Sequence, residues 1–440
     1  MTPGSFFLEI YGCQMNLADG ELIAGVLRRA GWRESGQADE ADLLVINTCA
    51  VRERAVERVV GHVRSLRPWK RARRGRRIAL VGCLARYDGS ALAAQLEEVD
   101  LFLGPDGYRH LPALLAEEPA ARLAPRGSPG ETYEGLTPAR RPGVNAWISI
   151  MRGCDRMCAY CMVPFARGRE RSLPAGAVLE EARQAVADGH PSLTLLGQTV
   201  TSYRDGETDF AALIGEIARS SGAARIRFLS PHPADFTDRL LDAIAQSPRI
   251  ARHFHLPVQA GSNRVLAAMR RGYTREDYLA LVERARERLS GLAVTTDLLT
   301  GFPGETEEDF AQTLDLMERV RFDSAFLFAY SERPRTYAAR RLPDDVPSEV
   351  KQERLRRMIA LQEKHGRVRY LERIGARVEV LVEGAARSPA NHWYGRSDDF
   401  KDVIFSAGAD PRVGEIVPVA VKAATSHTLF GERMAAAEGL

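Results

Sequence analysis

The stretch Gly153-Cys154-Asp155-Arg156-Met157-Cys158-Ala159-Tyr160-Cys161 directly follows an apolar run at residues 147–151 and spaces three cysteines as C-x3-C-x2-C. Three thiols within eight residues cannot all point into a hydrophobic core, so this spacing indicates a metal centre. A structural zinc site needs four ligands, and no fourth cysteine or histidine lies nearby in the sequence. A [4Fe–4S] cluster has four irons, so three thiolates leave one iron open to a bound small molecule. The stretch therefore favours an iron–sulfur cluster, with structural zinc as the alternative.

Apolar runs that alternate with helical stretches surround this motif. Downstream of it, the sequence predicts strands at residues 193–196, 226–229, 254–258, 293–299 and 325–330. Helices are predicted between the strands, for example at residues 177–188 and 275–289. Together with the run at 147–151, these elements make six βα units, which predict an open or closed α/β barrel. The cysteine loop then follows the first strand of that barrel.

The segments on either side of the barrel have different patterns. Apolar runs at residues 6–10, 43–46, 78–81 and 101–103, with helical stretches such as 17–30 and 52–66, predict an open parallel α/β sheet covered on both faces. A charged helical stretch at 348–373 precedes residues 374–435, whose alternation between glycines predicts a small all-β module. We therefore predict domains at residues 1–120, 143–372 and 373–437, and a linker rich in Pro, Gly and Arg at 121–142.

The other three cysteines of the chain occupy equivalent positions in the predicted N-terminal sheet. Cys13, Cys49 and Cys83 each lie just after an apolar run. In an open parallel sheet, ligand sites form outside the carboxyl ends of the strands, so the three thiols could converge there. The alternative is three small buried side chains, because free cysteine is among the most buried residue types. Three equivalent placements favour the shared site.

The amino-acid composition excludes some classes of protein. The chain has 440 residues, of which 45% are apolar and 27% charged, a globular balance that excludes general disorder. Its 61 basic and 58 acidic residues leave a net charge of +3, so a nucleic-acid site must be a local patch. No window approaches the roughly 18 uninterrupted apolar residues of a membrane span, and the N-terminus does not resemble a signal peptide. We expect a cytoplasmic protein with no membrane contact, whose cysteines are metal ligands.

The cysteine motifs carry a family resemblance. The C-x3-C-x2-C motif with Tyr160 before its last cysteine resembles the radical S-adenosylmethionine (SAM) superfamily. Residues 11–16, 47–53 and 82–85 resemble the N-terminal domain of methylthiotransferases, in which a radical domain and a small RNA-binding β-barrel called TRAM follow. The resemblance implies a fold with a partial (β/α)6 barrel, and SAM and two [4Fe–4S] clusters as cofactors. It implies Cys154, Cys158 and Cys161 as ligands of the SAM-binding cluster, and Cys13, Cys49 and Cys83 as ligands of an auxiliary cluster.

Further segments resemble one branch of that family. Residues 162–172, 255–262 and 269–274 are similar to the MiaB-type tRNA branch, which adds a methylthio group to C2 of N6-(dimethylallyl)adenosine next to the anticodon. The resemblance implies the tRNA anticodon stem-loop and an electron donor such as flavodoxin or ferredoxin as partners, and we expect a monomer. The alternatives are a threonylcarbamoyl-adenosine tRNA enzyme, a ribosomal-protein aspartate enzyme, and a non-enzymatic iron–sulfur RNA-binding protein.

The chain also departs from the pattern of that branch. Thr199 and Thr201 stand where asparagine is more usual. The segment 330–337 has Glu332, Arg335 and Tyr337 in place of the usual Pro, Gly and Pro, so its backbone turn and its substrate contacts could differ. None of these departures falls on a cysteine.

The remaining candidate site residues flank the cysteine loop or follow barrel strands. Tyr160, Gln198 and Gln259 are predicted to contact the cofactor, since active sites lie at the carboxyl ends of barrel strands. An anionic RNA must come within reach of the cluster, so contacts with RNA are predicted for Arg152, Arg167, Arg169 and Arg171. A basic run at residues 64–77 is a second place for phosphate contacts, or simply a solvated surface. We predict no catalytic side chain beyond the cluster ligands.

Overall fold

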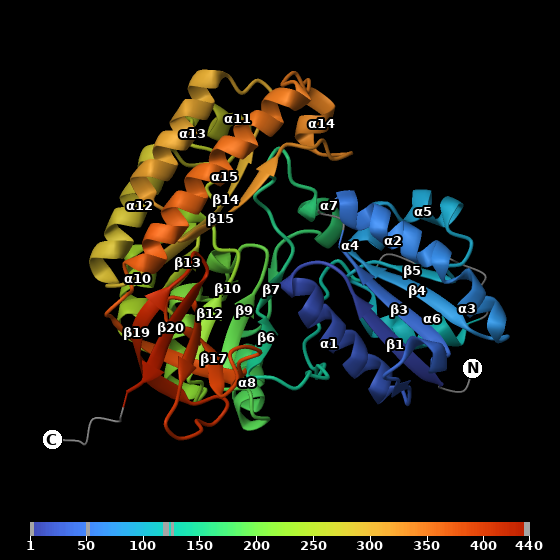
Figure 1. Cartoon of the computed structure of the whole chain (residues 1–440). Coiled ribbons are helices and arrows are strands. Elements are labelled where there is room, and N and C mark those ends of the chain that lie inside the picture. The colour runs from blue at the N-terminus through green and yellow to red at the C-terminus, as the bar shows by residue number, and fades with distance from the viewer. Residues whose placement is uncertain (1–3, 50–52, 118–122, 125–126, 435–440) are drawn as a thin grey trace.

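The N-terminal unit of this computed structural model is an open parallel sheet with helices on both faces (Figure 1). The structure describes residues 4–49, 53–117, 123–124 and 127–434. The sheet order is β2-β1-β3-β4-β5, with bounds β1 Ser5–Ile10, β2 Arg33–Glu34, β3 Leu43–Thr48, β4 Arg77–Gly82 and β5 Leu101–Leu103. The predicted open parallel α/β sheet is confirmed. The two-residue edge strand β2 was not predicted, because Arg33 and Glu34 are polar and form no apolar run.

Successive residues along each strand point to opposite faces of the sheet, so the hydrophobic core of this unit has two halves, one on each face. In β3, Leu43 and Val45 pack on one face of the sheet, and Leu44 and Ile46 pack on the other. The first face is covered by α1 (Gln14–Arg29) and α6 (Leu111–Ala116). The second face is covered by α2 (Glu53–Ser65), α3 (Arg67–Ala72), α4 (Cys83–Tyr87) and α5 (Gly89–Gln95). Because both faces are buried, the strands appear in the sequence as continuous apolar runs.

The central unit is a partial barrel of six parallel strands in two groups. The orders are β12-β9-β6 and β13-β14-β15. The bounds are β6 Asn145–Ser149, β9 Ser192–Leu196, β12 Arg225–Phe228, β13 His253–His255, β14 Ala293–Thr300 and β15 Ser324–Ala329. One continuous hydrophobic core contains residues from all six strands, so the two groups form one partial barrel.

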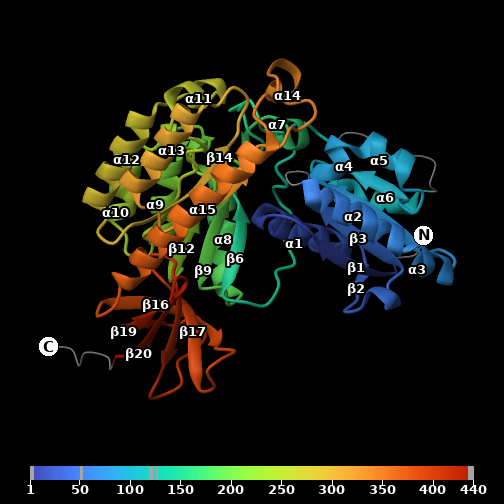
Figure 2. The same ribbon diagram turned by 45° about the horizontal axis from the view of Figure 1, so that its top comes forward.

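Helices cover the outside of this barrel. Their bounds are α8 Ala175–Ala187, α9 Phe210–Ser220, α10 Asp238–Ala245, α11 Asn263–Ala268, α12 Arg275–Arg288, α13 Glu307–Val320 and α15 Ser348–Leu371. Two short helices, α7 (Val163–Arg167) and α14 (Tyr337–Arg341), lie at the rim that faces the N-terminal unit (Figure 2). Strand β13 ends earlier than the predicted 254–258, because Pro257 lacks an N–H group and Gln259 has a left-handed backbone (φ 80°).

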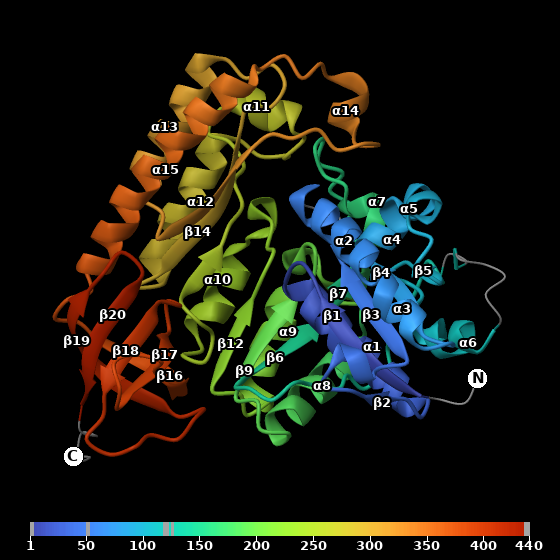
Figure 3. The same cartoon turned by 45° about the vertical axis from the view of Figure 1, so that its right-hand side comes forward.

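The C-terminal unit is a closed barrel in the strand order β16-β17-β18-β20-β19, which confirms the small all-β barrel. Its bounds are β16 Arg377–Ala385, β17 His392–Ser397, β18 Asp402–Ser406, β19 Ile416–Ala424 and β20 Thr428–Arg433. It packs at the amino ends of the central strands: Lys401 Nζ lies 2.6 Å from Asp323 Oδ1, just before β15. Figure 3 shows it at the end of the central barrel remote from α14.

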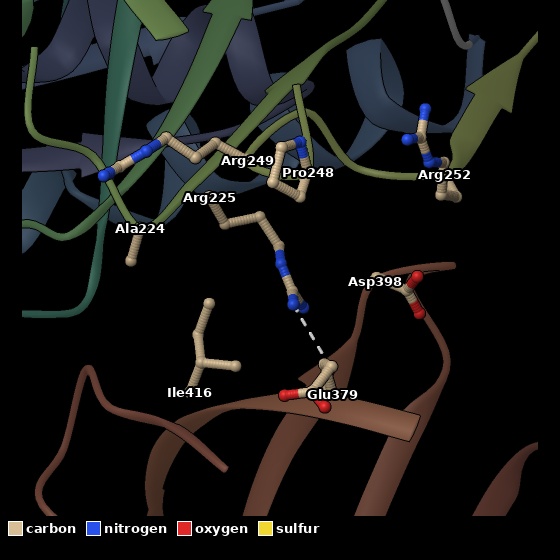
Figure 4. Close-up of a pocket in the computed structure, with 8 residues that line it drawn as sticks. All are labelled: Ala224, Arg225, Pro248, Arg249, Arg252, Glu379, Asp398 and Ile416. Atoms are coloured by element: carbon tan, nitrogen blue, oxygen red, sulfur yellow. Dashed lines mark hydrogen bonds between the residues drawn. The ribbon is translucent and has the colours of Figure 1, made fainter. Parts of the chain in front are cut away.

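A cleft of about 610 Å³ separates the central and C-terminal barrels (Figure 4). It is lined by Ala224, Arg225, Pro248, Arg249, Arg252, Glu379, Asp398 and Ile416. Arg225 crosses it and donates to the carbonyl oxygens of Arg396 (2.8 Å) and Glu379 (3.1 Å). The cleft is therefore part of the interface between the two barrels, which these hydrogen bonds stabilise. It lies at the opposite end of the central barrel from the cysteine loop.

Residues 127–142, which fall within the predicted linker, pack against the N-terminal unit. Tyr133 is buried, and its hydroxyl donates to the Pro105 carbonyl oxygen at 2.7 Å. The amide of Ala139 donates to the carbonyl oxygen of Glu21 in α1 at 2.8 Å.

In the part of the chain that the structure describes, no helix is both long and apolar enough to cross a membrane.

Candidate functional site

The three N-terminal cysteines meet at the carboxyl edge of the sheet. Cys13 precedes α1, Cys49 follows β3, and Cys83 is the first residue of α4. A hydrogen bond with Cys49 lowers the pKa of Cys13 to about 6, and the charge of Cys13 contributes to raising the pKa of Cys83, which burial raises most. Gly12 has φ 131°, and a Cβ there would lie 2.6 Å from Cys49 Cβ, so only glycine allows this approach.

The second set of cysteines lies in the loop after β6 and β7 (Met151–Arg152), at the rim that faces the first set. Burial, together with the charges of Cys158 and Cys154, raises the pKa of Cys161 to about 12. Cys154 Sγ lies 3.3 Å from Thr199 Oγ1, and Arg271 Nη1 donates to Cys158 Sγ at 3.2 Å. The three thiols are thus mutual neighbours with two defined polar contacts.

Both donor sets fit an iron–sulfur cluster better than a single metal ion. Among the described residues, no three His, Cys, Asp or Glu side chains converge tightly enough to bind a single metal ion. A cubane binds its thiolates through different irons, so its cysteines surround a larger centre. In each set a buried guanidinium also donates to one sulfur, Arg271 to Cys158 and Arg167 to Cys83 (Nε–Sγ 3.2 Å). Such hydrogen bonds stabilise the negative charge of cluster thiolates.

Two of the arginines predicted to contact RNA are buried between the N-terminal unit and the barrel. Arg152 Nη2 lies 2.5 Å from Asp19 Oδ1, and Arg167 Nη2 lies 2.8 Å from Asp19 Oδ2. The Asp19 side chain is fully buried, and the two arginine side chains are only 3% and 5% exposed. This burial corrects the prediction for Arg152 and Arg167, because it leaves a phosphate no access to either guanidinium. Asp19 instead ties α1 to both sides of the cysteine loop.

The other two arginines of that prediction lie nearer the surface. Arg169 is exposed, and its Nε lies 2.7 Å from Asp155 Oδ1. Arg171 is half-buried, pairs with Asp106 and donates to the carbonyl oxygen of Glu131 at 2.7 Å. Contact of Arg169 and Arg171 with RNA stays a prediction.

The three residues predicted to contact the cofactor lie around the second cysteine set. Burial raises the pKa of Tyr160 well above its usual value, while the nearby charge of Arg271 opposes that shift. Gln198 follows β9, and its Oε1 atom is buried without a hydrogen-bond partner among the described residues. The Gln259 backbone pairs with β14, since its amide donates to Asp297 and its carbonyl oxygen accepts from Leu299. The cofactor contacts of all three stay predictions.

Three residues of the site were missed from the sequence: Asp19, Thr199 as a partner of Cys154, and Arg271. Asp19 lies on the buried face of α1. A buried carboxylate without a partner is costly, so its position in the helix could have indicated a buried ion pair. Thr199 stood out only as a departure from the family pattern. Arg271 carried no signal of its own, since its contact with Cys158 spans 113 residues of sequence.

Gly153 provides a test of how tightly the cysteine loop is held. It has φ 75°, and a Cβ there would lie 1.9 Å from the carbonyl oxygen of Arg169, a backbone atom. Gly153→Ala is expected to cost more than the roughly 1–2 kcal/mol of a left-handed residue and to lower iron incorporation, because Cys154 must shift. Gly215→Ala in α9, where a Cβ would meet no atom within 4 Å apart from its chain neighbours and the backbone of its own helix, is the matched control and is expected to stabilise by about 0.5–1 kcal/mol. Thermal unfolding and iron analysis measure both; equal behaviour of the two variants would contradict the tight packing.

Comparison with known proteins agrees with this arrangement. Residues 148–317 match the model of the radical SAM superfamily, residues 5–104 that of "Uncharacterized protein family UPF0004", and residues 372–433 that of the TRAM domain. The radical SAM methyltransferase TsrM from Kitasatospora setae, solved with cobalamin and a [4Fe–4S] cluster, is similar in fold (TM-score 0.59, 16% identity, 77% of each chain). The fold and the matched models define a radical SAM enzyme with a TRAM domain after the radical SAM domain.

Relatives that match nearly the whole chain show which family of radical SAM enzymes it belongs to. The tRNA-2-methylthio-N(6)-dimethylallyladenosine synthase of Chlorobium limicola is 44% identical over 97% of each chain. The Porphyromonas gingivalis protein of the same name is 44% identical over 97% of this chain and 94% of its own. The chain belongs to the family of tRNA-2-methylthio-N(6)-dimethylallyladenosine synthases, which are radical SAM methylthiotransferases. Membership of this family implies SAM and [4Fe–4S] clusters as cofactors.

Proposed function

We propose that this chain adds a methylthio group to C2 of N6-(dimethylallyl)adenosine next to the anticodon of tRNA. One observation carries the proposal: two three-cysteine sets face each other across a domain boundary, and Arg167 of the barrel donates to Cys83 of the N-terminal unit. The names of the Chlorobium limicola and Porphyromonas gingivalis relatives support the choice of substrate.

Each cysteine set would hold one [4Fe–4S] cluster. When bound, SAM at the cluster of the barrel supplies a radical for hydrogen abstraction from adenine C2, and the auxiliary site supplies the sulfur. The ligands would be Cys154, Cys158 and Cys161 for the first cluster and Cys13, Cys49 and Cys83 for the second. Thr199 and Arg271 orient the first set through Cys154 and Cys158. Arg167 orients Cys83, and Asp19 holds Arg167 in place.

The remaining contacts and partners follow from this assignment. Tyr160, Gln198 and Gln259 would contact SAM or the adenosine, and Arg169 and Arg171 would contact RNA. A tRNA substrate is supported by the relatives' names and the TRAM domain. We propose the anticodon stem-loop as the bound part, flavodoxin or ferredoxin as the electron donor, a monomeric enzyme, and a cytoplasmic location.

The test is nucleoside analysis of tRNA from a bacterial strain that lacks its own methylthiotransferase and expresses this chain. Mass spectrometry is expected to find the methylthio form of N6-(dimethylallyl)adenosine restored, and a Cys158→Ala variant is expected not to restore it. Restoration of methylthio-threonylcarbamoyl-adenosine instead, or of the modified ribosomal-protein aspartate, would replace the proposed substrate. Clusters that assemble but never yield 5′-deoxyadenosine would favour a non-enzymatic RNA-binding protein.

A further inference from the structure

A cluster of arginines lies at the barrel rim, beside the radical cysteine loop. Two backbone hydrogen bonds attach its two segments to that loop: Ala338 N–H donates to the Ala159 carbonyl oxygen (2.8 Å), and Ala159 N–H donates to that of Met269 (2.9 Å). Arg270 follows Met269, and Tyr337 precedes Ala338 at the start of α14. The Arg270 guanidinium stacks over the Tyr337 ring, 3.5 Å from its centroid. The two segments therefore form one surface, which we call the arginine rim: Arg270, Arg335, Tyr337, Arg340 and Arg341.

The guanidinium groups of this rim are not neutralised. Arg270, Arg335, Arg340 and Arg341 are all exposed. Among the described residues, none of the four has a carboxylate within 4.0 Å or a side-chain hydrogen bond, whereas their neighbour Arg264 pairs with Asp309. Two carboxylates that follow α14 in the chain have other partners, since Asp344 binds Lys351 Nζ at 2.5 Å and Asp345 accepts from the Gly304 amide at 2.7 Å. Four positive charges are thus free to meet an anion.

Two of the four, Arg270 (φ 60°) and Arg335, are also held in an unfavourable backbone conformation. Arg335 has φ 67°, in the left-handed region that disfavours residues with a Cβ atom. Its guanidinium lies 5.3 Å from the centroid of the Tyr87 ring, in the helix that begins at Cys83. The Arg335 side chain therefore spans the gap between the two cysteine-bearing units. Backbone strain that persists at such a place points to a role in binding.

We infer that the arginine rim binds the single-stranded loop of the substrate RNA and holds it beside the radical cysteine loop, an inference that rests on the proposed function. Guanidinium groups pair with phosphate in a bidentate manner, and unpaired bases stack on guanidinium planes and aromatic rings. The TRAM domain lies at the opposite end of the barrel, as Figures 1 and 3 show, so a second anchor is needed where the chemistry occurs. The acidic surface of an electron-donor protein is the competing occupant.

The test measures binding of a fluorescent tRNA anticodon stem-loop to the full reconstituted chain by anisotropy over a series of salt concentrations. The slope of log K against log salt concentration falls in magnitude by about 0.7 for each phosphate contact that is lost. The double variant Arg340→Gln/Arg341→Gln is therefore expected to show a shallower slope and to bind roughly tenfold more weakly at about 0.15 M salt. Arg335→Gly is expected to weaken binding while thermal stability holds or rises, because glycine accepts the positive φ. The charge-matched control is Arg319→Gln/Arg367→Gln, on α13 and α15, and is expected to bind like the parent.

The outcomes separate this inference from the proposed function. Equal affinity and equal salt slope for the parent and the rim variants would overturn the inference and leave the function standing. A parent chain that binds no RNA would contradict the proposed function itself. Rim variants that keep their RNA affinity but are reduced more slowly by flavodoxin would assign the surface to the electron donor, and so would also overturn the inference.

Discussion

Asp19→Ala is expected to lower the stability of the N-terminal unit by about 3–5 kcal/mol, the usual cost of removing one partner from a buried ion pair. The variant leaves Arg152 and Arg167 buried between two units without their shared carboxylate. Those two charges contribute to lowering the pKa of Asp19, against the effect of burial, so the carboxylate is ionised in the folded chain. Denaturant unfolding followed by the fluorescence of the buried Trp32 and Trp69 measures the change.

The matched control for this variant is Asp315→Ala, which removes the exposed carboxylate that pairs with Arg275. Surface ion pairs contribute about 0–1 kcal/mol, so this variant is expected to unfold close to the parent. Asp19→Ala is also expected to lower iron bound at the N-terminal set, because Arg167 would no longer be held against Cys83. An Asp19→Ala chain as stable as the Asp315→Ala chain would show that the ion triad does not join the two units.

Cys158→Ala is expected to abolish formation of 5′-deoxyadenosine and to lower the iron content from about eight to about four atoms per chain, since each cluster carries four irons. Cys83→Ala is expected to cause the same loss of iron but to leave 5′-deoxyadenosine formation in place, while transfer of the methylthio group stops. The two variants serve as controls for each other, because each removes one ligand from one set. Iron analysis, absorbance and product chromatography follow both.

The pair of variants also separates the roles of the two sets. If Cys83→Ala abolished 5′-deoxyadenosine formation as completely as Cys158→Ala, then one cluster would be shared by the two sets. If both variants kept the full iron content, the cysteines would not be the ligands.

The fold was predictable from sequence where burial leaves a simple pattern. All six residues of β3 are buried, so this strand appears as an apolar run. Among the barrel strands, β9 is also buried throughout, whereas β6 and β14 alternate between buried and partly buried residues. The prediction was less accurate where local backbone geometry determines the end of a strand. Strand β13 ends early because of Pro257 and the left-handed backbone of Gln259. Strand β2 left no signal because two polar residues at a sheet edge need no apolar face.

The candidate site was predictable only in part. The cysteines were apparent because their spacing and their position after strands are local features of the sequence. The partners of these cysteines are not local: Asp19 meets Arg152 across 133 residues, and Arg167 meets Cys83 across 84. Arginines beside a cysteine loop were therefore assigned to RNA, although two of them are buried against Asp19. Only the packing of α1 and α7 between the two units shows that Arg152 and Arg167 pair with Asp19 and are not open to RNA.

The most direct test of the proposed function is a single-turnover reaction of the full reconstituted chain with SAM, a reductant and tRNA that carries N6-(dimethylallyl)adenosine. Mass spectrometry of the digested nucleosides is expected to find the methylthio group on that adenosine, together with 5′-deoxyadenosine. Formation of 5′-deoxyadenosine with the tRNA nucleoside unchanged, while threonylcarbamoyl-adenosine tRNA or a ribosomal protein gains the group, would contradict it.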